Sequence, residues 1–422
     1  MRPAVSLVHQ LFEWPPPSGG ELVCHDARMA TAEDRDARPE RGSLREVIRL
    51  FLKLGTIAFG GPAAHIALMH EEVVGRRRWV SEQQFLDLVG ATNLIPGPSS
   101  TELAIYLGFR RAGWRGLVAA GVCFIAPAFA IVLGLAVLDD RYGTTPVATD
   151  LLYGVTPVVV AIIAHALVLL GRTAVRGVGL AIIGLAALGG YLAGVHPLLL
   201  LGLGALVWLA VAAGRRLASR FGSTASILVT PALAGPWLLS ASTAAAGSIS
   251  LATVFWTFLK LGSVVFGSGY VLLAFLHDDL VEGLQVITDQ QLVDAVTIGQ
   301  ITPGPVFTTA TFIGYLIAGA SGAVVATVGM FLPSFVFVPL IDRLLAAIRR
   351  WAWVRTALDG VNVVAVALMA GVSVQLARTA LVDPLTVALA VTTLGVLLRW
   401  RPNPTWLIAA GAAVGLLRGW LG

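Results

Sequence analysis

Charged residues and cysteines are scarce in this sequence. Only 13% of its 422 residues are charged and 57% are hydrophobic, with a mean hydropathy of +0.82. Soluble domains carry about 25% charged and about 45–50% apolar residues, so the composition excludes an ordinary soluble protein. The two cysteines, Cys24 and Cys123, exclude a disulfide framework and a cysteine-based metal site.

Several sequence motifs of enzymes and pumps are also missing. No Gly-x-x-x-x-Gly-Lys-Ser/Thr loop is present, so this chain alone is not expected to be an ATP-driven pump. Because a serine elbow and an HExxH motif are missing too, we predict a non-enzyme without a cofactor or metal ion. The formal charge of +5 comes from basic residues at the ends of apolar segments, where membrane orientation explains them. Nucleic acid is therefore not an expected partner.

Long apolar segments fill the chain from residue 44 onward. Many exceed the roughly 18 residues that indicate a transmembrane helix, which predicts an all-α polytopic membrane protein embedded in a lipid bilayer. Residues 1–43 contain a proline and glycine cluster and are expected to be a disordered tail. Residues 214–250, interrupted by Pro231 and Pro236, are expected to be a linker. The predicted membrane domains are residues 44–213 and 251–422.

The two membrane domains are an internal duplication. The pentapeptide at 51–55 recurs letter for letter at 258–262, an offset of 207 residues. At the same offset, Pro96-Gly97-Pro98 returns as Pro303-Gly304-Pro305. The helix start predicted at Ser81, with Gln84 in the capping-box position, returns at Thr288. Such a series of matches indicates two structural repeats.

The distribution of arginines predicts that the repeats are inverted. In the first repeat, arginines flank the Pro-Gly-Pro segment on both sides, at 76–78 and at 110–115. In the second repeat they lie one loop later, at 343–355. Because basic residues collect in cytoplasmic loops, the Pro-Gly-Pro segment is expected to be a re-entrant hairpin. We predict about five transmembrane helices plus one such hairpin in each repeat, which places the N-terminal tail outside the cell.

The duplicated Pro-Gly-Pro is the predicted binding site. Proline cannot continue a helix, and a helix that begins after the break presents free N–H groups and a positive dipole end to an anion. Paired breaks in matching halves point to a transporter's binding site. The other reading is that Pro-Gly-Pro is only a kink. The predicted binding residues at the breaks are Gly60, Gly61, Asn93, Pro96, Gly97, Pro98, Ser99, Ser100, Thr101, Gly267, Gln300, Pro303, Gly304, Pro305, Thr308 and Thr309.

Two matched lysines and one glutamate are further candidates. Lys53 and Lys260 occupy equivalent positions in apolar segments, where an amine is costly. They are interpreted either as countercharges for a divalent anion or as side chains that snorkel to the membrane surface. Glu102 either carries a coupled proton or pairs with Arg110 or Arg111.

Two further pairs of matched residues remain open at this stage. Asn93 and Gln300 either donate to the anion or cap freed carbonyls. His70 and His277 stand beside acidic residues, but no further ligand has suitable spacing, so no metal site is predicted.

These motifs resemble the chromate transporter family in its long-chain, duplicated form. The likeness rests on Phe59-Gly60-Gly61-Pro62, on the Glu-Glu and Arg-Arg-Trp loop at 71–79, and on the run from Asn93 to Ser99. It implies a secondary transporter of a small oxyanion in the bacterial inner membrane, which exports chromate, with sulfate as a similar anion, by alternating access. A proton-coupled antiporter is the form expected here.

Other functions stay open at this stage. One alternative is uptake of sulfate or of another small anion. Another is a membrane scaffold or an intramembrane enzyme that transports nothing. The second repeat reads Phe266-Gly267-Ser268-Gly269 and lacks the proline of the first, so equal contributions by both repeats are in doubt. The sequence leaves a homodimer open as well as a monomer.

Overall fold

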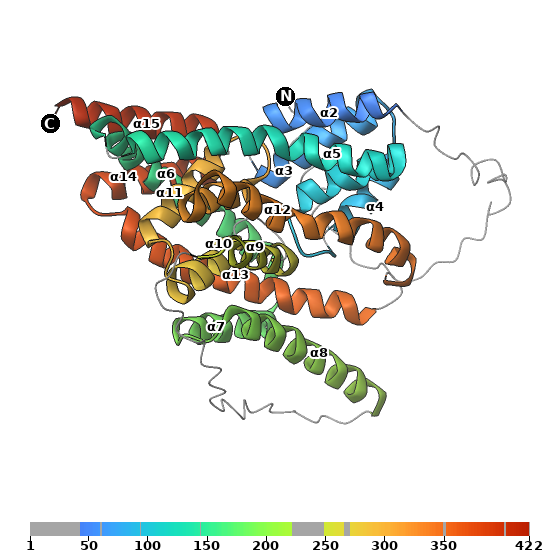
Figure 1. Ribbon diagram of the computed structural model, residues 1–422. Helices are drawn as coiled ribbons and strands as arrows, with labels where there is room; N and C mark the ends of the chain where they lie inside the picture. Colours follow the sequence, from blue (N-terminus) through green and yellow to red (C-terminus); the bar gives the residue numbers. More distant parts are fainter. Residues whose placement is uncertain are drawn as a thin grey trace.

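The computed structural model describes residues 43–59, 61–92, 94–143, 145–221, 249–265, 271–348, 352–400 and 402–421. Within these ranges the chain forms helices and no strands (Figure 1). Five helices are long and apolar enough to cross a membrane, so the all-α polytopic class is confirmed. The predicted tail, apart from Ser43, and residues 222–248 of the predicted linker lie outside the described residues.

The helices occur in the same order in both halves of the chain. The first half contains α2 (Leu44–Ile57), α3 (Gly61–His70), the π-helical turn η2 (Glu71–Arg76), α4 (Glu82–Thr92), α5 (Ser99–Tyr142), α6 (Pro146–Ala174), α7 (Val178–Leu192) and α8 (Pro197–Phe221). The second half contains α9 (Leu251–Val264), α10 (Leu272–Leu276), η3 (His277–Gly283), α11 (Asp289–Ile301), η4 (Val306–Thr308), α12 (Thr309–Ile348), α13 (Ala352–Ala380), α14 (Pro384–Trp400) and α15 (Pro404–Leu421). The predicted duplication is therefore present in the structure.

The predicted helix start before α4 is also present. The Gln84 N–H donates to Ser81 Oγ at 3.2 Å, and the Ser81 N–H donates to Gln84 Oε1 at 2.9 Å. The equivalent residues Thr288 and Gln291 make the same capping box before α11. Both re-entrant hairpins therefore begin with one local sequence signal.

A sharp reversal divides α5 and α12 into two arms each. Gly113 in α5 has φ +60° and Gly319 in α12 has φ +61°, conformations that side chains other than hydrogen rarely allow. A Cβ atom added to Gly108 would lie 2.4 Å from the carbonyl oxygen of Gly116, so the chain folds back on itself there. Residues 99–112 are thus the second arm of the first re-entrant hairpin, and residues 113–142 form the next membrane helix.

Both ends of this hairpin lie at the same end of the molecule. The guanidinium of Arg111, which closes the second arm, lies 5.2 Å from the ring centroid of Trp79, which precedes the first arm α4. The same guanidinium lies 3.1 Å from Glu46 in the first turn of α2. The starts of α2 and α4 and the end of the second arm therefore share one level, which we call the arginine-rich end. It carries Arg76, Arg77, Arg78, Arg110, Arg111 and Arg115, and the pairing of Arg110 with Asp342 brings the end of α12 with Arg343 to it. Because α13 begins four residues after α12 ends, its first two turns, with Arg355 and with Asp359 paired to Arg176, lie there too, and Arg215 lies beside Gly179 at the start of α7.

The segment from Leu44 to Met69 corrects the predicted topology. We expected it to cross the membrane, yet it breaks between α2 and α3, and its two ends return to the level of Glu46 and Trp79. Gly61 at the break has φ +77°, and Pro62 has no N–H to continue a helix. With only 14 residues, α2 is about 21 Å long and reaches part of the way into a bilayer. The segment therefore folds back as a hairpin of its own, and α2 begins at the arginine-rich end rather than at the opposite end.

The two halves run in opposite directions. Asp342 near the end of α12 accepts from Tyr106 at 2.6 Å and lies 3.6 Å from Arg110, which precedes the reversal in α5. In return, Asp140 near the end of α5 accepts from Tyr315, which precedes the reversal in α12, at 3.4 Å. The start of each long membrane helix therefore meets the end of the other, as an inverted repeat requires.

Candidate anion-binding centre

Two equivalent backbone hydrogen bonds connect the helix breaks of the two halves. The Gly97 N–H donates to the Val265 carbonyl at 2.7 Å, and the Gly304 N–H donates to the Ala58 carbonyl at 2.9 Å. Gly97 and Gly304 are repeat equivalents, and so are Ala58 and Val265. Each Pro-Gly-Pro therefore contacts the C-terminal end of the first helix of the opposite half, α9 for Gly97 and α2 for Gly304.

Glycine is required at the centre of both Pro-Gly-Pro turns. Gly97 has φ +134° and Gly304 has φ +95°, a region that favours glycine. A Cβ atom on Gly97 would lie 2.3 Å from Glu102 Oε1, and one on Gly304 would lie 2.8 Å from the Ala128 Cβ. Close packing and backbone conformation thus fix the same residue type at both positions.

The first break presents a helix N-terminus to the centre. Pro98 caps α5 without a side-chain hydrogen bond, and its carbonyl accepts from the N–H groups of Thr101 and Glu102. The N–H groups of Ser99 and Ser100 belong to the first turn and have no intrahelical partner. Ser100 and Thr101 are buried, whereas Pro96 and Ser99 are partly exposed. This end of the helix is the part of the break that a solute could reach.

A buried histidine that the sequence analysis missed joins this centre. His65 in α3 is 1% exposed, and its Nε2 lies 3.1 Å from the Ala58 carbonyl while its Nδ1 lies 3.2 Å from Ser100 Oγ. Because a carbonyl only accepts, Nε2 carries a proton, and in the neutral ring Nδ1 accepts from the Ser100 hydroxyl. One feature of the sequence could have identified His65. It lies about one helical turn after the Gly-Gly-Pro break, as Glu102 lies about one turn after Pro-Gly-Pro.

Glu102 is fully buried and contacts the opposite half. Its Oε1 accepts from Ser334 Oγ in α12 at 3.3 Å, whereas Oε2 has no hydrogen-bond partner among the described residues. Of the two alternatives for Glu102, pairing with Arg110 or Arg111 is not observed, since these arginines pair with Asp342 and Glu46. Thr101 Oγ1 is likewise buried without a partner in the described part of the chain. Unused polar atoms therefore gather at the first break.

The second break is more closed and less polar. Residues 302–310 are all buried, and the break continues into the short turn η4. The Thr308 and Thr309 hydroxyls donate to the carbonyls of Pro305 and Val306, at 2.7 and 2.8 Å. Gln300 keeps one buried amide nitrogen without a partner among the described residues. Leu272 and Thr309 stand where the first half has His65 and Glu102, so the centre is asymmetric.

Both candidate lysines are ion-paired away from the breaks. Lys53 Nζ lies 2.7 Å from Glu72 Oε1, and Lys260 Nζ lies 2.6 Å from Asp279 Oδ1. The hydrogen bond from Lys53 lowers the pKa of the Glu72 carboxyl in η2, at the arginine-rich end. Each ion pair joins the first helix of its half, α2 or α9, to the π-helical turn that follows, η2 or η3. A role as countercharge stays a prediction, and the predicted residues Gly60, Asn93 and Gly267 lie outside the described residues.

The two matched histidines have equivalent partners. His70 Nε2 lies 2.8 Å from Glu82, and His277 Nε2 lies 3.0 Å from Asp289, which is the repeat equivalent of Glu82. Each pair links the α3–η2 or α10–η3 junction to the start of the next α-helix, α4 or α11. Because the same histidine–carboxylate contact occurs in both repeats, we interpret it as a structural contact between neighbouring helices.

Comparison with known proteins identifies the chain. Residues 45–209 and residues 252–416 each match the family model described as chromate transporter. The chain belongs to the chromate transporter family. It is thus a multi-pass protein of the bacterial inner membrane. No solved structure matches it.

Curated relatives cover nearly the whole chain. The chromate transport protein of Cupriavidus metallidurans is 34% identical over 379 residues, which are 89% of this chain and 93% of that protein. The chromate transport protein of Pseudomonas aeruginosa is 30% identical over 402 residues, 93% of this chain and 95% of that protein. The probable chromate transport protein of Synechococcus elongatus is 32% identical over 382 residues, 88% and 95% of the two chains.

Proposed function

We propose that the protein exports chromate from the cytoplasm and binds the dianion at the first Pro-Gly-Pro break. The meeting of four helix breaks through the reciprocal bonds of Gly97 and Gly304 carries this proposal. Relatives at 30–34% identity over about nine-tenths of the chain are named chromate transport proteins, which supports the substrate.

The chemistry of the first break suits a doubly charged oxyanion. The free N–H groups of Ser99 and Ser100 and the positive end of the α5 dipole stabilise negative charge. The hydroxyls of Ser99 and Thr101 are further donors, so several oxygens of a tetrahedral anion can be bonded at once. Sulfate has the same shape and charge and is expected to compete with chromate. The greater polarity of the first break makes it the main contributor, with Gln300 from the second half.

Glu102 is the proposed proton carrier. Its buried carboxyl lies at the substrate end of α5 and has one oxygen that no described residue bonds. A carboxyl that binds a proton in one state and releases it in another couples anion movement to the proton gradient. Since its repeat equivalent is Thr309, only the first half supplies this group.

The inverted repeats provide the route for alternating access. The two halves are antiparallel and share the centre, so rocking one half against the other opens it to opposite ends in turn. The bonds from Gly97 to Val265 and from Gly304 to Ala58 cross between halves and are the contacts that such rocking changes.

The test is uptake of labelled chromate into inverted membrane vesicles, with and without a proton gradient. Export predicts uptake into these vesicles, stimulation by the gradient and competition by sulfate. The Ser100→Ala variant is expected to raise the half-saturating chromate concentration, whereas the equivalent Phe307→Ala variant is a control for packing in the second half. Chromate accumulation in right-side-out vesicles instead would support the uptake alternative, and no movement in either orientation would exclude transport.

A further inference from the structure

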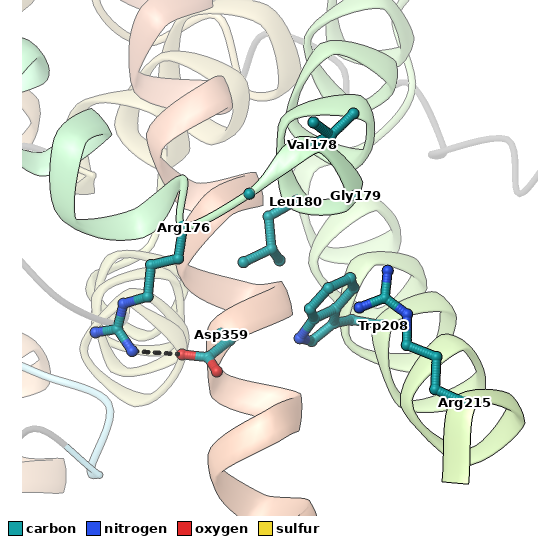
Figure 2. A pocket seen from close by; sticks show the side chains of 8 residues that line it. Arg176, Val178, Gly179, Leu180, Trp208, Arg215 and Asp359 are labelled. Atoms are coloured by element: carbon teal, nitrogen blue, oxygen red, sulfur yellow. Dashed lines mark ion pairs between the residues drawn. The ribbon is translucent and has the colours of Figure 1, made fainter. Parts of the chain in front are cut away.

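A cavity outside the helix breaks lies beside the second turn of α13, at the arginine-rich end. It has a volume of about 290 Å³ and opens between the α6–α7 connection, α8 and α13 (Figure 2). Its lining consists of Arg176, Gly177, Val178, Gly179, Leu180, Trp208, Arg215 and Asp359. None of these residues takes part in the anion-binding centre.

The cavity carries an excess of positive charge. Arg176 lies 3.7 Å from Asp359, the carboxylate in the lining. Arg215 packs over the Trp208 ring at 5.6 Å and makes no ion pair among the described residues. The α7 N-terminus also faces this region, and Gly177 leaves it without a side-chain cap. Two guanidinium groups and a helix dipole thus stand against one carboxylate.

An exposed apolar surface on α7 and α8 adjoins this basic cavity at Val178. Val178, Ile182 and Leu185 follow one face of α7 and are 78%, 60% and 70% exposed. Leu199, Leu203 and Leu206 of the neighbouring helix α8 are also exposed. In a membrane protein such a surface contacts lipid acyl chains, and arginine and tryptophan mark the headgroup level. The cavity therefore lies where phospholipid phosphates are found.

We propose that this cavity binds the phosphate of an anionic phospholipid from the cytoplasmic leaflet. Arg215 and Arg176 bond the phosphate oxygens, while the acyl chains cover the exposed faces of α7 and α8. A soluble phosphate would meet the same cations but would leave the apolar surface uncovered, so the lipid is the favoured source. The bound lipid joins the α6–α7 connection to α8 and α13.

The experiment titrates the purified full-length protein in detergent with phosphatidylglycerol or phosphatidylcholine and follows thermal unfolding. Phosphatidylglycerol is expected to raise the wild-type melting temperature more than phosphatidylcholine does. Arg215→Gln is expected to raise the half-saturating phosphatidylglycerol concentration about tenfold, the effect of losing a charge-assisted bond. Arg399→Gln is the matched control, because Arg399 packs over Trp400 at 5.9 Å at the end of α14, outside the cavity.

Three outcomes of the lipid titrations would overturn the proposal. They are equal responses to the two lipids, an Arg215→Gln variant that responds like the wild type, and an Arg399→Gln variant that loses as much. Glycerol phosphate at matched concentration separates the lipid from the free anion, and a wild-type shift as large as that of phosphatidylglycerol would overturn the lipid assignment. Arg176→Lys, which keeps the charge, is expected to retain more binding than Arg176→Gln, so a general folding defect is recognised.

Discussion

The carboxyl of Glu102 accepts a hydrogen bond from the hydroxyl of Ser334 at 3.3 Å, across 232 positions of sequence and between the two repeats. In the second half Thr309 takes the place of Glu102, and in the first half Ala128 takes the place of Ser334. The equivalent contact therefore has neither the carboxyl nor the hydroxyl that bonds it. The backbone hydrogen bonds of the centre thus follow a twofold symmetry, whereas its ionisable side chains, Glu102 and His65, come from the first half alone among the residues described. This asymmetry decides which substitutions are expected to stop transport.

Glu102→Gln is expected to abolish the effect of the proton gradient. The amide keeps the shape and an acceptor for Ser334 but cannot exchange a proton, and removing a proton-transfer group typically costs 10²–10⁴-fold in rate. Chromate uptake into inverted vesicles, with and without a gradient, measures this. Thr309→Val is the matched control and is expected to stay gradient-driven. A Glu102→Gln protein that still responds to the gradient would rule out Glu102 as the proton carrier.

His65→Leu is expected to leave a folded protein with weakened chromate transport. Leucine stands at the equivalent position, Leu272, so an apolar side chain of this size is compatible with the hairpin. The change removes the bonds to Ala58 and Ser100, so the Ser100 hydroxyl is no longer held in place. Chromate uptake should fall at least about tenfold, with normal yield and melting temperature. Normal uptake would show that His65 does not orient the site.

Gly97→Ala is expected to destabilise the protein. An added Cβ would meet Glu102 Oε1 at 2.3 Å, and φ +134° is strained for alanine, at about 1–3 kcal/mol. Gly134→Ala is the control, because a Cβ there meets nothing within 4 Å. Thermal unfolding in detergent should therefore separate the two variants by several degrees. Equal melting temperatures would contradict the packing seen at the first break.

Lys260→Ala is expected to be more destabilising than Lys53→Ala. Without Lys53, Glu72 keeps Arg76 at 3.2 Å and Arg77 at 3.3 Å. Asp279 has no second ion pair among the described residues, and its other oxygen is already buried and unbonded. A mostly buried carboxylate left alone is costly. The added variant Asp279→Asn should restore much of the loss in melting temperature, and failure to do so would point to packing instead of charge.

The start of α2 is expected to be accessible from the cytoplasm. In a protein with Cys24 and Cys123 replaced by serine, a single cysteine at Ser43 should react with an impermeant maleimide in inverted vesicles and be protected in intact cells. A cysteine at Arg78 should behave identically, because both positions lie at the arginine-rich end. Opposite labelling of the two positions would restore a crossing between residues 44 and 69.

The sequence was sufficient to predict the breaks, the duplication and the inversion, because each depends on a local or charge pattern. Pro-Gly-Pro stops a helix wherever it occurs, and arginines sort to one side of a membrane. The course of residues 44–69 was predicted wrongly for a similar reason. An apolar run of crossing length resembles a transmembrane helix, and whether it turns back at Gly61 depends on what the break contacts, here Gly304 of the other half.

Side-chain partners were harder to predict than the backbone. The matched lysines looked like countercharges because their acids, Glu72 and Asp279, stand 19 residues away in the sequence. Each acid comes near its lysine only when the chain folds back between the first helix of its half and the π-helical turn. The pairing of Glu102 with Ser334 depends on how two repeats dock. No local pattern contains that information, so the role of Ser334 emerged only from the folded arrangement.

The reciprocal bonds of the Pro-Gly-Pro glycines have a consequence for ancestry. Each half accepts a hydrogen bond from a glycine amide of the other, so a polypeptide equal to one half would leave the glycine N–H of its Pro-Gly-Pro without that partner in the hydrocarbon layer. Such a half-size chain would need a second copy inserted upside down to complete itself. Fusion of two such copies fixes their opposite orientations in one molecule, after which each copy is free to lose the groups the other retains.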